Sequence, residues 1–86
     1  MTVLKSLDTI ANINPIPIER LTLVEPEYQS ISYLPTGQVG TIVEIYEGET
    51  PQYLVEFADL QGREYAMALL QKSEVLAIRY ELSTVG

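Results

Sequence analysis

From Glu19 onward, hydrophobic and polar residues alternate in short segments, which is the two-residue period of a β-strand with one buried face. Glycine, proline and aspartate separate these segments, as is typical of turns. The LQKSE segment fits a single turn of 3₁₀ helix before the last strand. The expected strands have the sequences RLTLV, VGTIVEIY, YLVEFA, REYAMAL and VLAIRY. Five strands this short predict an all-β fold, and a small half-open barrel would leave few exposed edges.

The two faces of each strand predict the core and the outer surface. In VGTIVEIY we expect Val39, Val43 and Ile45 to point inward with Thr41, because the opposite face would bury Glu44. In the other strands we expect Tyr53, Val55, Phe57, Leu76 and Ile78 to point inward, with Tyr65 also in the core. Met67 and Leu69 share the face of Tyr65, and Leu21 shares a face with Leu23. An apolar outer face often marks a protein–protein contact. The candidate interface is therefore Ile42, Tyr46, Leu54 and Tyr80.

The first 17 residues have a different pattern. Apolar residues at Val3, Leu4, Leu7, Ile10 and Ala11 fit one face of a short helix. Two prolines, Pro15 and Pro17, then favour an extended run. We therefore expect an N-terminal arm at 1–17, outside the central sheet, a barrel at 18–82 and a C-terminal tail at 83–86. A helix this short is marginal in water and must pack against another surface. That surface is either its own domain or a neighbouring subunit.

Gly37 and Gly40 raise the question of a phosphate-binding loop. Such a loop needs glycines at the start of a helix, where backbone N–H groups and the helix dipole face the anion. Here the glycines lead into a strand, and no Gly-Lys-Ser or Gly-Lys-Thr follows. We expect Gly37 to close a turn that begins at Leu34, and Gly40 to permit a bulge or the close approach of another backbone. A second tight turn is predicted at Asp59-Leu60-Gln61-Gly62.

The segments PTGQVGTIVEIY, YLVEFADLQGREYAMALL and VLAIRYE resemble the bacterial domain-of-unknown-function family 4926. The resemblance covers about Leu21 to Tyr80, leaves residues 1–17 outside, and rests on turn and core residues. It implies an SH3-like barrel in small proteins that are frequent in cyanobacteria, and it implies no activity. The linker before Pro35 is long for that family.

A broader similarity links GQVGTIVEI to the KOW motif of ribosomal and transcription-factor barrels. It implies RNA binding through basic loops. The lysines expected around the glycine turn are missing from this chain, so the similarity fails at the residues that would contact RNA.

Composition and charge narrow the classes of function. The 86 residues include no cysteine, histidine or tryptophan, which removes disulfides, thiolate nucleophiles and the commonest general base and metal ligand. A net charge of −7 repels nucleic acids and anionic membranes. The chain shows neither a secretory signal nor an apolar stretch of the roughly 20 residues that a spanning helix needs. We expect a cytoplasmic protein without catalytic residues, cofactors or metals.

Charged residues beside the turns do not change this expectation. Two glutamate pairs, Glu25 with Glu27 and Glu47 with Glu49, lie in polar segments and are interpreted as solvated surface charge. Catalytic carboxylates would need a cleft, and dedicated calcium sites an aspartate-rich pattern. Asp59 and Arg63 bracket the second turn and are expected to pair across it, contributing about 1 kcal/mol at most.

Taken together, these patterns favour a small module that binds a partner protein or self-associates into a dimer or higher oligomer. An acidic surface would steer it to a basic partner, for example the toxic, nuclease-like member of a two-protein pair. The alternative is an accessory subunit of a larger complex, as SH3-like barrels serve in photosynthetic assemblies, although the charge argues against docking to acidic ferredoxin. RNA binding and enzymatic activity are the weakest hypotheses.

Overall fold

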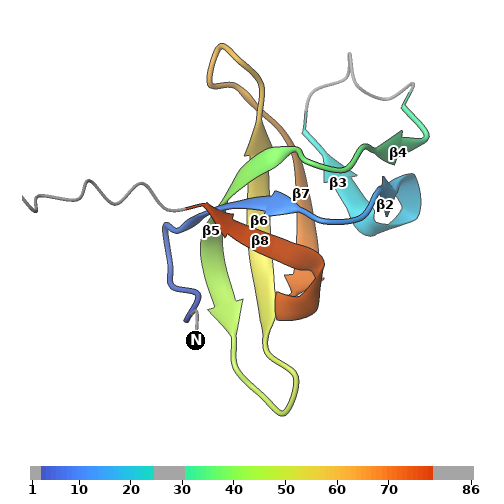
Figure 1. Cartoon of the computed structure of the whole chain (residues 1–86). Helices are drawn as coiled ribbons and strands as arrows, with labels where there is room; N and C mark the ends of the chain where they lie inside the picture. Colours follow the sequence, from blue (N-terminus) through green and yellow to red (C-terminus); the bar gives the residue numbers. More distant parts are fainter. Residues whose placement is uncertain (1–2, 25–30, 79–86) are drawn as a thin grey trace, which may run out of the picture.

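The computed structural model of the chain describes residues 3–24 and 31–78 (Figure 1). In this part the fold is all-β, with antiparallel strands, two 3₁₀ turns and no α-helix. Six strands form one sheet in the order β3-β7-β6-β5-β1-β8, and β2 and β4 form a separate pair. The elements are β1 (Thr9–Asn12), β2 (Ile16–Pro17), η1 (Ile18–Arg20), β3 (Leu21–Leu23), β4 (Tyr33–Leu34), β5 (Val39–Tyr46), β6 (Gln52–Ala58), β7 (Glu64–Gln71), η3 (Lys72–Glu74) and β8 (Val75–Ile78).

The five strands expected after residue 20 are confirmed as β3, β5, β6, β7 and β8, and the expected 3₁₀ turn is η3. Consecutive hairpins join β5 to β6 and β6 to β7, and they extend from opposite ends of the sheet (Figure 1). Strands β3 and β8 are the two edges of the sheet and are not paired with each other in the described residues. The sheets of the fold are therefore open and antiparallel.

The N-terminal segment contributes a strand, so the prediction of a helix in an arm outside the sheet is wrong. Strand β1 lies between β5 and β8 and pairs with both. Ile10 is fully buried, opposite Gly40 and Ala77. Leu7 has a φ of +73°, which a right-handed helix does not permit. Apolar spacing fitted a helix, but a short helix is marginal alone, whereas two strand ladders satisfy the backbone on both sides.

The extended run expected at the two prolines is present, and it forms a further pair of strands that the sequence did not predict. Ile16 lies opposite Leu34, and each is only 2% exposed. Proline is tolerated in β2 because the strand has only two residues and one paired neighbour, β4. This short pair therefore extends the core beyond the main sheet.

Strand β5 carries a bulge that reverses the predicted faces over its first half. The pairing with β6 shifts register between Ile42 and Glu44, so Val43 is the additional residue. Before the bulge, Gly40 and Ile42 point inward and Val39 is 51% exposed. After it, Ile45 packs against the core and Glu44 is exposed, as predicted. The assignment of Val39 to the core is wrong because a bulge changes the parity of the residues on either side.

Most of the core comes from β6 and β7, as predicted for β6. The inward positions Tyr53, Val55 and Phe57 are all buried, and Tyr65 is 6% exposed. The prediction that Met67 and Leu69 share the face of Tyr65 is wrong, because the pairing with β6 shifts register at Tyr65 and the buried residues after it are Ala66, Ala68 and Leu70. The prediction for β8 is wrong, because Leu76 is 61% exposed and Val75 is buried. The pairing is consistent with this difference, because Ala77 lies opposite Ile10, which is fully buried. Val75 shares the face of Ala77, whereas Leu76 lies opposite Ala11 and points to the other face. The core cluster is Leu4, Ile10, Ile16, Leu34, Ile42, Tyr53, Val55, Phe57, Tyr65, Ala66, Ala68, Leu70 and Val75.

Candidate protein-interaction surface

The structure changes the predicted interface. Tyr46 is 51% exposed at the end of β5, and Leu54 is half-buried in β6. The placement of Ile42 on the outside is wrong, because the bulge at Val43 turns this residue fully into the core. Tyr80 lies outside the described residues. Two of the four predicted side chains therefore remain as candidates on the described surface.

Strand pairing brings Leu54 next to residues that the sequence did not connect with it. Leu54 lies directly opposite Leu69 of β7 on one side and Glu44 of β5 on the other. One step along the sheet, Glu56 lies opposite Met67. These positions alternate with the buried residues of the same strands, so they share one surface. We name this surface the outer face, and it comprises Thr22, Glu44, Tyr46, Gln52, Leu54, Glu56, Met67 and Leu69.

A shallow pocket of about 480 Å³ opens on the outer face over β3, β6 and β7. Its apolar lining comes mainly from Leu54, Met67 and Leu69, and the last of these is 43% exposed. Thr22 and Gln52 add polar lining, and Arg20 borders it. The pocket is therefore centred on side chains that could accept an apolar group.

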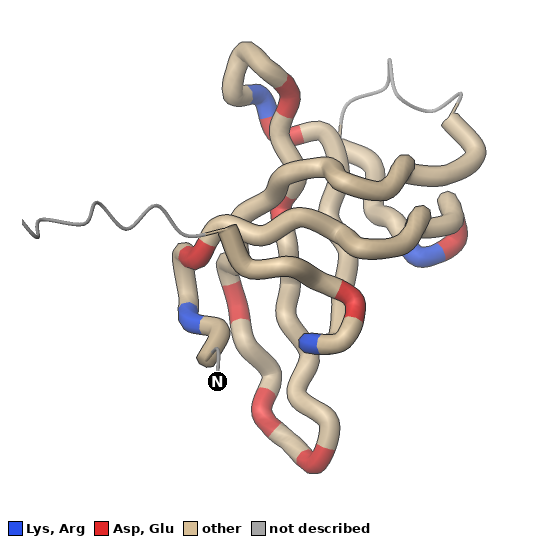
Figure 2. Tube along the Cα trace, viewed as in Figure 1, with Lys and Arg blue, Asp and Glu red and all other residues tan. Residues whose placement is uncertain are grey.

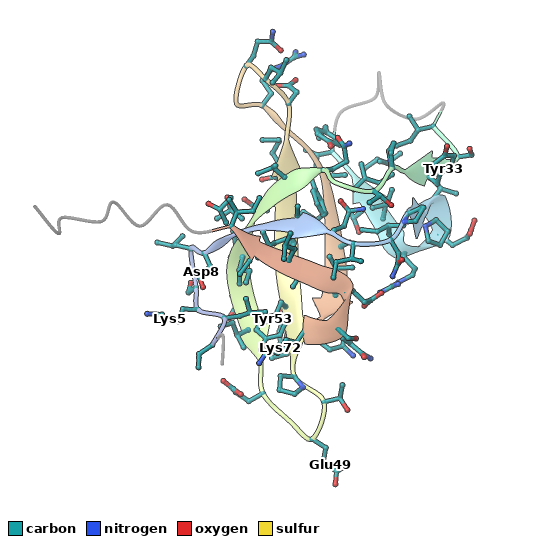
Figure 3. All side chains as sticks on the ribbon, in the orientation of Figure 1. Lys5, Asp8, Tyr33, Glu49, Tyr53 and Lys72 are labelled. Atoms are coloured by element: carbon teal, nitrogen blue, oxygen red, sulfur yellow. The ribbon has the colours of Figure 1, made fainter. Side chains whose placement is uncertain are left out.

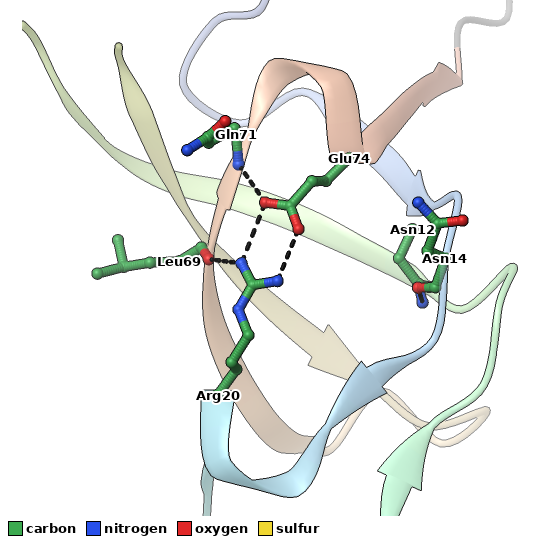
Figure 4. A network of polar contacts seen from close by, with 6 residues as sticks. All are labelled: Asn12, Asn14, Arg20, Leu69, Gln71 and Glu74. Carbon is green, nitrogen blue, oxygen red and sulfur yellow. Dashed lines mark hydrogen bonds and ion pairs between the residues drawn. The ribbon is translucent and has the colours of Figure 1, made fainter.

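Arg20 is held in place at this pocket by hydrogen bonds (Figure 4). Its Nη1 donates to Oε2 of Glu74 at 2.7 Å, and its Nη2 donates to Oε1 of Glu74 and to the carbonyl of Leu69, both at 3.0 Å. The Gln71 backbone N–H also donates to Glu74. The hydrogen bond to Arg20 is the largest cause of a lowered pKa of Glu74, and it raises the pKa of Arg20. The charge of Arg20 is thus compensated within the chain.

Carboxylates lie near Leu54, Met67 and Leu69, on the side of these residues away from Arg20. Glu44 is exposed, and Glu56 and Glu64 are half-buried. Glu64 lies opposite Ala58, two residues along β6 from Glu56. Burial, followed by a hydrogen bond to Glu56 and the charge of that residue, raises the pKa of Glu64. The outer face therefore combines an apolar centre with negative charge that no cation of the face compensates.

The hairpin between β6 and β7 confirms the predicted turn and ion pair. The Gly62 N–H donates to the Asp59 carbonyl at 2.9 Å, and Gly62 has a φ of +81°. The Asp59 carboxylate accepts from the backbone N–H groups of Gln61 and Arg63 and from Nε of Arg63 at 3.2 Å. The Arg63 backbone N–H is the largest cause of a lowered pKa of Asp59. These contacts shape the turn.

The glutamates of the β5–β6 loop are surface charges, as predicted. Glu47 and Glu49 are exposed, and the loop carries no basic residue (Figures 2 and 3). Glu25 and Glu27 lie outside the described residues. Across the described ranges, no three acidic side chains are grouped as a metal site would need. None of the helices in those ranges has the length and hydropathy to cross a membrane.

Gly37 and Gly40, which the sequence analysis considered as a possible phosphate-binding loop, have structural roles. Gly37 has a φ of +86°, in the left-handed region that glycine adopts at little cost, and its N–H donates to the Asn12 carbonyl. A Cβ at Gly40 would lie 2.6 Å from a Val55 methyl carbon and 2.9 Å from the Glu56 carbonyl oxygen. Gly37 lies in a turn before β5 and Gly40 lies within β5, so the interpretation as turn and close approach is confirmed. The turn is at Thr36–Gly37, one residue later than the turn expected to begin at Leu34.

A second apolar region was missed by the sequence analysis. Two adjoining pockets of about 410 and 370 Å³ share Gln38 and Tyr65. The exposed side chains around them include Tyr33 on β4 (Figure 3) and Leu60. These residues come from three separate segments, so no periodic pattern could have grouped them.

Comparison with known proteins supports a family but not a function. No curated protein and no solved structure matches the chain. A family model matches residues 7–77, which includes β1 and so extends the relationship beyond the Leu21 boundary expected from the sequence. Because this match spans most of the sequence, the chain belongs to the family described as Domain of unknown function (DUF4926).

Proposed function

We propose that this chain is a non-enzymatic protein-interaction module that binds a basic partner protein. We further propose that its sheets form an SH3-like half-open barrel. The order of elements supports this: β1 and β8 are adjacent, two hairpins join β5, β6 and β7, and a 3₁₀ turn precedes β8.

The observation that carries the proposal is the composition of the outer face. Leu54, Met67 and Leu69 present apolar surface around a pocket, and carboxylates stand beside them. Apolar surface removed from water stabilises a complex, whereas complementary charge selects the partner and speeds association. A net charge of −7 adds long-range attraction for a basic protein.

One specific form of this function is neutralisation of a toxic, basic partner by an acidic cover. A second is service as an accessory subunit, in which the same face attaches the chain to a larger complex. Self-association through the outer face is a further mode that we propose for the free chain. The negative charge of the outer face disfavours RNA binding. If the chain did bind RNA, its affinity for RNA would fall steeply as the salt concentration rises.

The test is recovery of the partner from the native host by tagged pull-down at physiological salt, followed by purification of both proteins. We expect one stoichiometric basic protein that binds the isolated chain, as measured by calorimetry. A matched pull-down with Leu54→Glu controls for adhesion to the tag. Absence of any stoichiometric protein, or a purified candidate that shows no binding, would overturn the proposed function.

A further inference from the structure

We infer that the outer face is the docking surface for the partner, and that it accepts a protein segment whose apolar side chains are flanked by lysine or arginine. The inference rests on the proposed function and adds to it the place and chemistry of the contact.

The apolar part of the surface is continuous across two strands. Leu54 and Leu69 are directly opposite each other, and Met67 is the next outward residue along β7. All three line the pocket of about 480 Å³. Side chains opposite one another on neighbouring strands have Cβ atoms about 4.5–5.5 Å apart, so the three form one patch. A partner that buries this patch must present apolar groups of its own.

Charge complementarity selects the chemistry around those groups. Glu44 stands beside Leu54, and Glu56 stands beside Met67, so a carboxylate accompanies both apolar positions. Arg20, on the opposite side of the pocket, is already paired with Glu74 and adds no free positive charge. A lysine or arginine next to each apolar side chain of the partner would therefore meet a carboxylate.

Other occupants fit these charges less well. A second copy of the chain would bring a second set of Glu44 and Glu56 into the same interface, which adds like charges without adding a free cation. A nucleic acid would place phosphates against them. Both alternatives become outcomes of the experiment below.

The probe is a library of random peptides displayed on phage, selected on the immobilised full-length chain at physiological salt. Enriched peptides are then synthesised and titrated by calorimetry. We expect them to combine Leu, Met, Val or Phe with Lys or Arg. Leu54→Glu should weaken their binding by at least about tenfold. The matched control is Leu60→Glu, because Leu60 is fully exposed in the β6–β7 turn and borders the other apolar region; it should leave affinity unchanged.

A pair of double variants isolates the contribution of charge. Glu44→Gln with Glu56→Gln removes two carboxylates from the outer face, and Glu47→Gln with Glu49→Gln removes two from the β5–β6 loop. Both variants change the net charge equally. We expect the first to lower affinity by about tenfold and the second by less than about threefold, since long-range attraction changes equally in both.

Several results would overturn the inference. The selection could enrich no peptide, or it could enrich acidic or uncharged peptides. The enriched peptides could also bind Leu54→Glu as tightly as they bind the wild type. Loss of binding with Leu60→Glu alone would assign docking to the region around Tyr65. A dimer that blocks the outer face and leaves no peptide bound would assign this face to a second copy of the chain.

If Leu54→Glu does not fold, Leu69→Glu replaces it, because Leu69 is more exposed. A basic protein that binds Leu54→Glu and Leu69→Glu normally would refute the docking surface and leave the proposed function intact.

Discussion

The guanidinium of Arg20 and the carboxylate of Glu74 form two hydrogen bonds, 2.7 and 3.0 Å long, between residues 54 positions apart in the sequence. The pair joins η1, which precedes β3, to η3, which precedes β8. Glu74 also completes a capping box with Gln71. One carboxylate therefore connects the two edges of the sheet through the turns that precede them.

We predict that this pair stabilises the fold by a modest, pH-dependent amount. A double-mutant cycle with Arg20→Gln and Glu74→Gln should give a coupling free energy of about 0.5–1 kcal/mol at pH 7, since the pair is bidentate but partly solvated. Arg20 lowers the pKa of Glu74 in the folded state below its ordinary value of 4.5. The stabilisation is therefore present above pH 4.5 and is lost as the pH falls through the folded pKa.

The measurement is urea unfolding at neutral pH and at acid pH. The difference in free energy of unfolding between the wild type and Glu74→Gln should shrink on acidification. Glu19→Gln, which changes an exposed acid of η1, serves as the control and should show no such trend. A difference that stays constant with pH would contradict the role assigned to the Glu74 charge.

The buried Asn12 side chain is predicted to be the main polar contact that holds the β4–β5 connection against β1. Its Nδ2 donates to the carbonyls of Asn14 and Pro35, and its Oδ1 accepts from the Gln38 N–H. Asn12→Ala removes the side-chain partner of all three backbone groups, so we expect a loss of about 2–3 kcal/mol in the free energy of unfolding. Asn14→Ala, at an exposed position, should change it by less than about 0.5 kcal/mol. Equal effects in urea denaturation would show that the Asn12 side-chain contacts do not matter.

Gly40 is predicted to be intolerant of any side chain. A methyl group there would meet Val55 and the Glu56 backbone of β6 at distances too short for ordinary contact. Gly40→Ala should therefore cost about 1–3 kcal/mol, because β5 and β6 must move apart to accept it. Gly48→Ala is the matched control, since nothing lies within 4 Å of its Cβ position. Thermal unfolding of the two variants separates them, and a Gly40→Ala protein as stable as Gly48→Ala would contradict the close approach.

The sequence predicted β3, β5, β6, β7 and β8 because alternation and turn residues are local signals. It could not reveal the bulge at Val43. The prediction kept Glu44 exposed by assigning every second residue of the strand, from Val39 to Ile45, to the core. In the structure the bulge exchanges the two faces within the strand, so Gly40 and Ile42 are buried before it. This single local irregularity removed Ile42 from the predicted interface. A glycine at position 40 was the signal available, because a residue without a side chain suits the most crowded inward position.

The N-terminal strand and the composition of the outer face could not be predicted from local sequence patterns, because both depend on pairing between distant segments. Thr9–Asn12 is a strand because β5 and β8 supply partners on both sides, and those partners are distant in the sequence. Leu54 was identified as an outward residue, but its neighbours on the surface are set by register across β5, β6 and β7. For Leu54, strand alternation predicted the direction of the side chain, whereas strand pairing decides which residues lie beside it.

Self-association of the free chain should depend on salt. Two outer faces that meet would place Glu44 and Glu56 near like charges, so screening should strengthen the contact, opposite to the behaviour expected for a basic partner. Tyr46→Lys with Leu54→Glu should give folded monomers at every salt concentration. The measurement is molar mass by light scattering at low and high salt, with circular dichroism to confirm folding. An association that weakens with salt, or a double variant with the molar mass of the wild-type oligomer, would place the contact on another surface. Because Leu60 lies outside the outer face, Leu60→Glu should associate as the wild type does, which separates a specific face from general apolar adhesion.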